Sequence, residues 1–130
     1  MGPGAAVRSA VVRHFNGLLT AEASQAAYRA IGVPLYSSAV FAMAPRIALD
    51  FYTAYRDDDV ERQRLLLDEF YTPLVRLRDQ TPGFAVSLIK AGLRLRGVAV
   101  GPVRAPLVDP SPRQLAELER ILAHGEDVLG

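Results

Sequence analysis

The sequence predicts an α/β fold in which two strands alternate with helices and a run of further helices follows. Residues 11–15 and 35–41 are short apolar segments of strand composition, and the segment between them has helical character. Such a strand–helix–strand unit implies parallel strands. Beyond residue 45, apolar side chains recur at helical spacing. Because two parallel strands have exposed edges and normally need neighbours, the pattern indicates a piece of a larger α/β fold.

Local signals delimit the first strand and its helix. Residues 11–15 are expected to form the strand, and the turn pair at residues 16–17 (NG) ends it. Thr20 is the expected N-cap of the following helix, where Glu22 in the first turn suits the helix dipole. The helix is expected to reach about residue 31 and to stop at Gly32.

The second strand and its helix have equally clear limits. Pro34 cannot donate to a sheet ladder, so it fits the start of a strand that runs to about residue 41. Pro45 suits the first turn of the next helix. The aspartates at residues 57–59 interrupt the helical pattern and can cap the helix that follows.

The second half of the chain is predicted to be helical. Pro73 lies inside the first of these helices and is expected to kink it. Ser111 and Gln114 form a capping box after a proline-rich, irregular stretch at residues 101–110. The expected helices cover residues 60–77, 84–95 and 112–123.

Composition excludes several classes of protein. The formal charge of +1 gives no argument for a nucleic-acid partner or an anionic membrane. The absence of cysteine excludes disulfides and thiolate zinc sites. No apolar stretch approaches the ~18 residues that span a bilayer. Residues 1–10 lack the apolar core of a secretory signal, so a cytoplasmic location is expected.

Four segments resemble the 5-dehydro-4-deoxyglucarate dehydratase family, in the family's order. Residues 36–41 (YSSAVF), with a proline-led helix after them, resemble its last barrel strand. Residues 15–22 resemble the end of the preceding strand and the start of its helix. Residues 83–92 (GFAVSLIKAG) and 101–107 (GPVRAPL) resemble a late helix and the family's characteristic tail. The similarity covers roughly residues 11–124.

This resemblance implies the C-terminal part of a TIM (β/α)8 barrel, followed by a helical extension. The last two strand–helix units would occupy residues 11–57, and the extension would occupy residues 58–130. Residues 1–10 would form a flexible N-terminus. Since a complete barrel needs roughly 200 residues or more, a chain of 130 residues cannot close one alone.

The resemblance also implies a chemistry. The family belongs to the Schiff-base-forming lyases related to dihydrodipicolinate synthase and N-acetylneuraminate lyase. Its reaction dehydrates and decarboxylates 5-dehydro-4-deoxy-D-glucarate, a keto sugar acid, to 2,5-dioxopentanoate, with no metal or organic cofactor. The full-length family is expected to form homo-oligomers. Its Schiff-base lysine, proton-relaying tyrosine and carboxylate-binding loop lie on earlier strands, so this chain alone is predicted to hold no catalytic residue and to be inactive.

The candidate substrate-binding residues are Asn16, Gly17, Ser37 and Ser38, because barrel enzymes bind substrate at the carboxyl ends of their strands. Alternation places Ser37 and Ser38 on opposite faces, so at most one points inward, and the sequence does not decide which. The alternative for the serines is that their hydroxyls satisfy nearby backbone groups. For Asn16 and Gly17 the alternative is an ordinary turn.

Two other kinds of site are not favoured. Lys90, the only lysine, lies on a predicted late helix, whereas a Schiff-base lysine needs a desolvated pocket. His14 and His124 have no carboxylates at metal-ligand spacing.

Two alternative functions stay open. The chain could be a non-catalytic remnant or helical association module. It could also belong to a related aldolase of the dihydrodipicolinate synthase type, although the paired serines argue against this.

Overall fold

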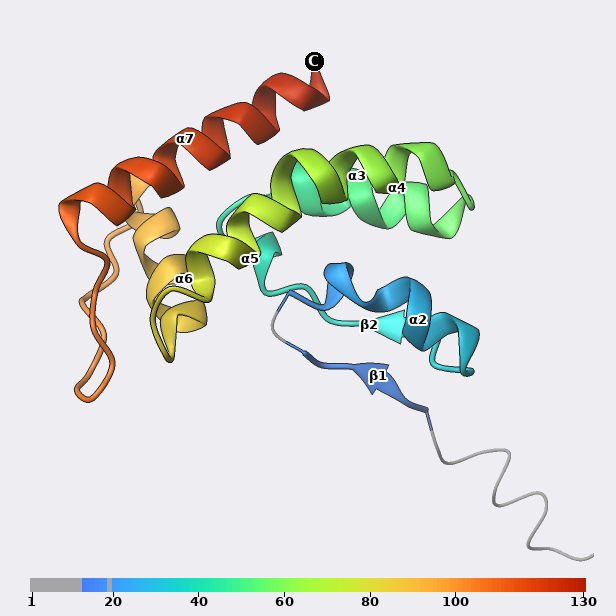
Figure 1. Ribbon diagram of the computed structural model, residues 1–130, viewed down its shortest axis with the longest axis horizontal. Helices are drawn as coiled ribbons and strands as arrows, with labels where there is room; N and C mark the ends of the chain where they lie inside the picture. Colours follow the sequence, from blue (N-terminus) through green and yellow to red (C-terminus); the bar gives the residue numbers. More distant parts are fainter. Residues whose placement is uncertain (1–12, 19) are drawn as a thin grey trace, which may run out of the picture.

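Two short parallel strands lie beside a larger group of helices in the computed structural model (Figure 1). The structure describes residues 13–18 and 20–130, so the expected flexible N-terminus and the first part of the expected first strand lie outside the described residues. Strand β1 (Phe15–Asn16) pairs in parallel with β2 (Leu35–Tyr36), with Phe15 opposite Leu35 and Asn16 opposite Tyr36. The predicted strand–helix–strand unit with parallel strands is therefore confirmed.

The second strand is shorter than predicted. Only Leu35–Tyr36 is strand, and Val40–Ala42 forms a 3-10 helix, η2, where the sequence predicted continued strand. The backbone N–H of Phe41 donates to Ser38 Oγ at 3.2 Å, a local contact that competes with a sheet ladder. Burial of Val40, 1 % exposed, draws the chain into the helical core.

The segment between the strands also differs from the prediction. A 3-10 turn, η1 (Ala21–Ala23), precedes helix α2 (Gln25–Ala30). Thr20 occupies the expected N-cap position, ahead of η1, but its side chain makes no cap hydrogen bond and instead accepts from Arg78 Nη1 at 2.9 Å. The predicted stop at Gly32 is confirmed by its positive φ of 90°, a conformation that glycine adopts without strain.

Helix α3 (Pro45–Arg56) begins at its proline as predicted. The Asp59 side chain caps helix α4 (Val60–Leu66) by accepting from the Arg62 N–H. A π-helical turn, η3 (Leu67–Tyr71), then leads into helix α5 (Thr72–Arg78). The irregularity expected at Pro73 thus takes the form of a π-turn immediately before the proline, where the missing N–H would break the regular α-helical ladder.

Two further helices complete the fold. Helix α6 (Phe84–Leu95) follows the predicted break, and helix α7 (Pro112–Leu129) starts at the predicted capping box of Ser111 and Gln114. Helix α7 runs beyond the predicted end at about residue 123, and in this added part Gly125 is buried and Val128 and Leu129 pack against the core. It lies along η3 and packs on α3, α5 and α6 (Figure 1).

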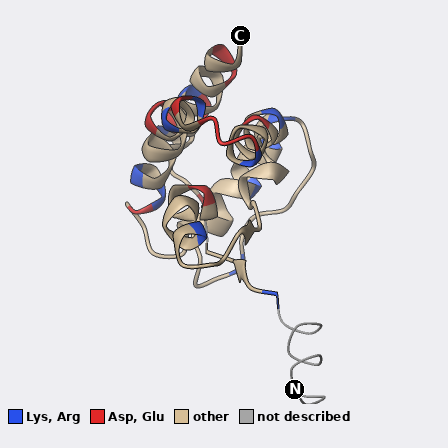
Figure 2. Ribbon diagram, turned by 90° about the vertical axis from the view of Figure 1, so that its right-hand side faces the viewer, with Lys and Arg blue, Asp and Glu red and all other residues tan. Residues whose placement is uncertain are grey.

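One apolar core joins the strand end to the helices. It includes Val40 and Met43 from η2 and its C-cap, Phe51 from α3, Phe70 from η3 and Leu118 from α7. Figure 2 shows charged residues of both signs along the helices, with little charge on the strands. None of the helices in the described ranges is long and apolar enough to cross a membrane.

Close packing of α6 on η2 gives a first testable prediction. A Cβ at Gly92 would lie 2.8 Å from Met43 Cβ and 2.5 Å from its Sδ. Gly92→Ala should therefore lower the free energy of unfolding by ~1–2 kcal/mol, despite the better helix propensity of alanine. Gly101→Ala is the control, since nothing lies within 4 Å of that position and the change should be nearly neutral. Urea unfolding measures both, and a Gly92→Ala chain as stable as the unmodified one would contradict the packing.

Candidate functional site

The four predicted site residues meet where the two strands end. Asn16 closes β1 and Gly17 follows it, while Ser37 and Ser38 directly follow β2. The backbone N–H of Ser37 donates to the Asn16 carbonyl at 3.1 Å, which extends the ladder by one hydrogen bond. The carboxyl ends of both strands therefore form one edge, as the sequence predicted.

The sheet has one covered face and one open face. Tyr36 packs against α3, with its ring 5.6 Å from that of Tyr55 in an edge-on arrangement. Asn16, its partner in the register, is also buried, at 1 % exposed. The neighbouring pair on the opposite face, Phe15 and Leu35, is 61 % and 36 % exposed. By alternation, Ser37 belongs to the open face and Ser38 to the covered one.

Asn16 holds the turn after β1 from the covered side. Its Nδ2 lies within 3.2 Å of three acceptors, the Ala21 carbonyl, Ser24 Oγ and Gln25 Oε1. Its Oδ1 accepts from the Leu18 N–H at 3.2 Å. The side chain of Asn16 therefore supports η1 and α2 and is not open to a ligand.

Glu22, Ser38 and Tyr71 form a buried group, here called the Glu22 cluster. The Glu22 side chain comes from η1 and is 1 % exposed. Its Oε2 accepts from Ser38 Oγ at 2.7 Å and from the Tyr71 hydroxyl at 3.0 Å. Within the described part of the chain, no ion pair includes Glu22, and its Oε1 and the buried Tyr36 hydroxyl have no hydrogen-bond partner.

Burial and the neighbouring Glu22 raise the pKa values of the two nearby phenols, Tyr71 and Tyr36. Burial raises the pKa of Tyr71 well above its usual value, and the adjacent Glu22 carboxylate raises it further. Burial also raises the pKa of Tyr36, and Glu22 is again the second cause. Tyr71 is therefore a protonated hydrogen-bond donor at neutral pH, which matches its contact with Glu22.

The two serines differ in what they are free to do. Ser38 Oγ is engaged twice, since it donates to Glu22 and accepts from the Phe41 N–H. Ser37 is exposed, and its side chain makes no hydrogen bond to any residue that the structure describes. Gly17 is also exposed, and a Cβ there would meet nothing within 4 Å. Ser37 and Gly17 are thus the accessible members of the predicted site.

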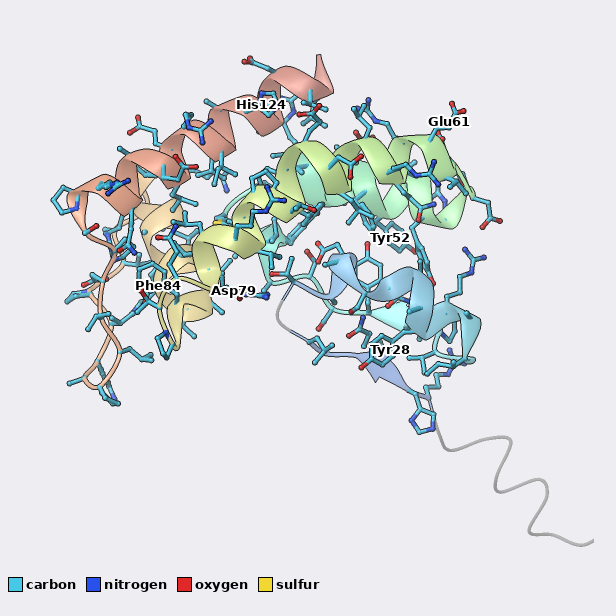
Figure 3. All side chains as sticks on the ribbon, viewed as in Figure 1. Tyr28, Tyr52, Glu61, Asp79, Phe84 and His124 are labelled. Carbon is cyan, nitrogen blue, oxygen red and sulfur yellow. The ribbon has the colours of Figure 1, made fainter. Side chains whose placement is uncertain are left out.

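Lys90 and His124, which the sequence did not favour as a Schiff-base lysine and as a metal ligand, lie away from the strand ends. Lys90 is on α6, and its Nζ donates to the Pro102 carbonyl at 3.2 Å. His124 on α7 pairs with Glu69 at 2.8 Å, on the outside of the helical group (Figure 3). No three histidine or acidic side chains gather as metal ligands in residues 13–18 and 20–130.

Glu22 and Tyr71 were missed as members of this site. The sequence suggested a helix-dipole role for Glu22, and it placed Tyr71 within the helix expected at residues 60–77. Their contact spans 49 positions of the chain and depends on tertiary packing. The only sign of this role in the sequence was a glutamate a few residues after a predicted strand. Most glutamates at such positions are exposed to solvent, so this sign did not distinguish Glu22.

Comparison with known proteins agrees with this geometry. The sequence model of the Dihydrodipicolinate synthetase family matches residues 6–125. The chain therefore belongs to this family of TIM-barrel proteins. It is 58% identical over 116 residues to "Probable 5-dehydro-4-deoxyglucarate dehydratase 2" of Streptomyces coelicolor, an alignment that covers 89% of this chain and 36% of that protein. It is 49% identical over 109 residues to "Probable 5-dehydro-4-deoxyglucarate dehydratase" of Delftia acidovorans, covering 84% and 36%.

The fold is also found in a solved structure. N-acetylneuraminate lyase of Proteus mirabilis matches with a TM-score of 0.64 and 19% sequence identity, over 84% of this chain and 35% of that one. The prediction of a partial TIM barrel with a helical extension is thus confirmed. The chain spans about a third of the length of the curated relatives it matches.

The burial of Tyr71 predicts how stability depends on pH. In the unfolded chain this phenol ionises near its usual pKa of 10.0, whereas the folded chain keeps it protonated at higher pH. Above about pH 10 the unfolded state binds fewer protons, so stability falls by ~1.4 kcal/mol per pH unit for this group. Tyr71→Phe should be less stable at pH 7, because Glu22 loses a donor, but its stability should fall less steeply above pH 10.

Urea unfolding at pH 7, 10 and 11 measures both slopes. If the free energies of unfolding of Tyr71→Phe and of the unmodified chain fall equally steeply with pH, the Tyr71 hydroxyl is not buried against Glu22.

Proposed function

We propose that this chain forms part of the substrate pocket of a 5-dehydro-4-deoxyglucarate dehydratase. The reaction would remove water and carbon dioxide from 5-dehydro-4-deoxy-D-glucarate to give 2,5-dioxopentanoate. The observation that carries the proposal is the accessible Ser37 at a strand end, in a chain 58% identical to a relative with that name. The Schiff-base lysine would come from outside this chain.

The role of each accessible residue follows from its chemistry. The substrate is a keto acid with carboxylates and hydroxyls, which are hydrogen-bond partners for a serine hydroxyl. Ser37 would donate to one of these groups from the open face of the sheet. Gly17, which has no side chain, would let a substrate approach the backbone closely. Ser38 and Asn16 would support the edge, since their side chains already have partners.

A second candidate function is association without catalysis. It is favoured by the exposed apolar pair Phe15 and Leu35 on the open face, which another polypeptide could cover. The two candidates differ in a single respect, which is whether this chain supports turnover once the rest of the barrel is present.

The placement of Lys90 predicts that this chain alone forms no Schiff base. Lys90 lies on α6 and bonds a backbone carbonyl, away from the strand ends. Incubation with the keto acid, reduction with borohydride and mass spectrometry should show an unchanged mass. A reduced adduct on Lys90 would place the reactive amine in this chain and refute the assignment.

The proposed function is tested by joining this chain to the remaining two-thirds of the Streptomyces coelicolor relative. This joined protein should turn over 5-dehydro-4-deoxy-D-glucarate. Ser37→Ala should lower kcat/KM by about tenfold to a hundredfold, the effect of losing one substrate hydrogen bond worth ~1.5–3 kcal/mol. If the joined protein turns over the substrate and Ser37→Ala does so equally well, Ser37 does not contact the substrate.

Lys90→Arg in the joined protein is the control, because it keeps the charge at a position away from the strand ends. Its turnover should equal that of the unmodified protein. A folded joined protein that lacks all turnover would favour association over catalysis.

A further inference from the structure

The Glu22 cluster links the helical extension to the strand ends. Tyr71 belongs to the π-turn η3, Glu22 to the turn η1 after β1, and Ser38 to the segment just after β2. One carboxylate oxygen, Oε2 of Glu22, accepts from both hydroxyls. Three elements that are distant in the sequence therefore meet at a single buried atom.

The extension holds its end of this link rigidly. The ring of Tyr71 is fully buried and packs edge-on against Phe51 at 5.3 Å and Phe70 at 5.0 Å. These rings belong to the central core, so they fix where the Tyr71 hydroxyl lies. Since Glu22 has no ion pair among the described residues, the two hydroxyls fix the position of its carboxylate.

The other end of the link holds the backbone on both sides of Ser37. On the N-terminal side, the Ser37 N–H donates to the Asn16 carbonyl. On the C-terminal side, Ser38 Oγ donates to Glu22 and accepts from the Phe41 N–H. The side chain of Ser37 is thereby presented on the open face between two anchored points.

We propose that Glu22 and Tyr71 are positioning residues for Ser37, so that the helical extension sets the geometry of the substrate-binding edge. This inference rests on the proposed function, because it takes Ser37 as the residue that contacts substrate. Neither Glu22 nor Tyr71 touches substrate, since both are buried. They act through Ser38.

The first test measures the anchored backbone itself, in the 130-residue chain and without activity. Hydrogen exchange of the Phe41 amide should become about tenfold faster in Tyr71→Phe, the factor expected when a charged acceptor loses one donor. Ser87→Ala is the matched control, because it removes another buried hydroxyl, which donates to the Val108 carbonyl at 2.6 Å. The Phe41 amide in Ser87→Ala should exchange at the unmodified rate.

A second variant guards against a chain that fails to fold. Glu22→Gln keeps the size of the side chain but weakens its acceptor, and it should accelerate exchange of Phe41 in the same way. Equal acceleration in Ser87→Ala and in the two cluster variants would mean a general loss of stability, and it would overturn the proposal.

The second test is a kinetic cycle in the joined protein. Tyr71→Phe should lower kcat/KM by about tenfold when Ser37 is present, and by less than about twofold in a Ser37→Ala background. A purely structural role would lower kcat/KM equally in both backgrounds and would refute the inference. If the unmodified joined protein has no turnover, the proposed function fails, and the exchange of Phe41 alone decides whether the cluster positions the strand end.

Discussion

The arrangement of this chain depends on one buried carboxylate. Removing an ionised side chain from water is costly unless hydrogen bonds replace the lost solvation. Glu22 meets this requirement at Oε2, which accepts from Ser38 after the second strand and from Tyr71 in the helical extension, whereas its Oε1 has no hydrogen-bond partner among the described residues. These two hydrogen bonds to one oxygen connect the strand edge to the helices.

A second constraint comes from the unequal faces of the sheet. The covered face is closed by aromatic rings, with Tyr36 packed edge-on against Phe51 and Tyr55 of α3. The open face carries Phe15, Leu35 and Ser37, all of which are exposed. In a parallel sheet both faces are normally buried. The open face is therefore where the rest of a barrel would be expected, with Ser37 at its rim.

The sequence predicted elements whose signals are local. The helix starts at Pro45 and Ser111 and the helix stop at Gly32 follow from the chemistry of a few adjacent residues. The parallel pairing follows from the order of strand, helix and strand. The sequence prediction failed where a distant contact prevailed over local preference. Thr20 lies at the expected N-cap position, but its side chain accepts from Arg78, 58 positions away, and makes no cap hydrogen bond.

In the candidate site, too, features with local signals could be predicted and features that depend on distant contacts could not. Its four predicted residues do share one edge, because strand order and alternation are readable from the pattern. The sequence could not decide between Ser37 and Ser38, since that depends on which strand face the helices cover. It also could not predict the role of Glu22, because a glutamate that follows a strand is normally solvated. Only the packed position of Tyr71 gives this carboxylate its second donor.

The π-turn before Pro73 has a consequence for how this protein can change over evolution. A π-turn holds one residue more than an α-helix needs over the same length. Deleting a residue from η3 would restore a regular helix, but it would rotate one side of the break by about 100° relative to the other. Tyr71 could then no longer face Glu22 while α4 kept its packing. Substitutions on the surface of this helix are therefore tolerated, whereas insertions or deletions that change its length are not.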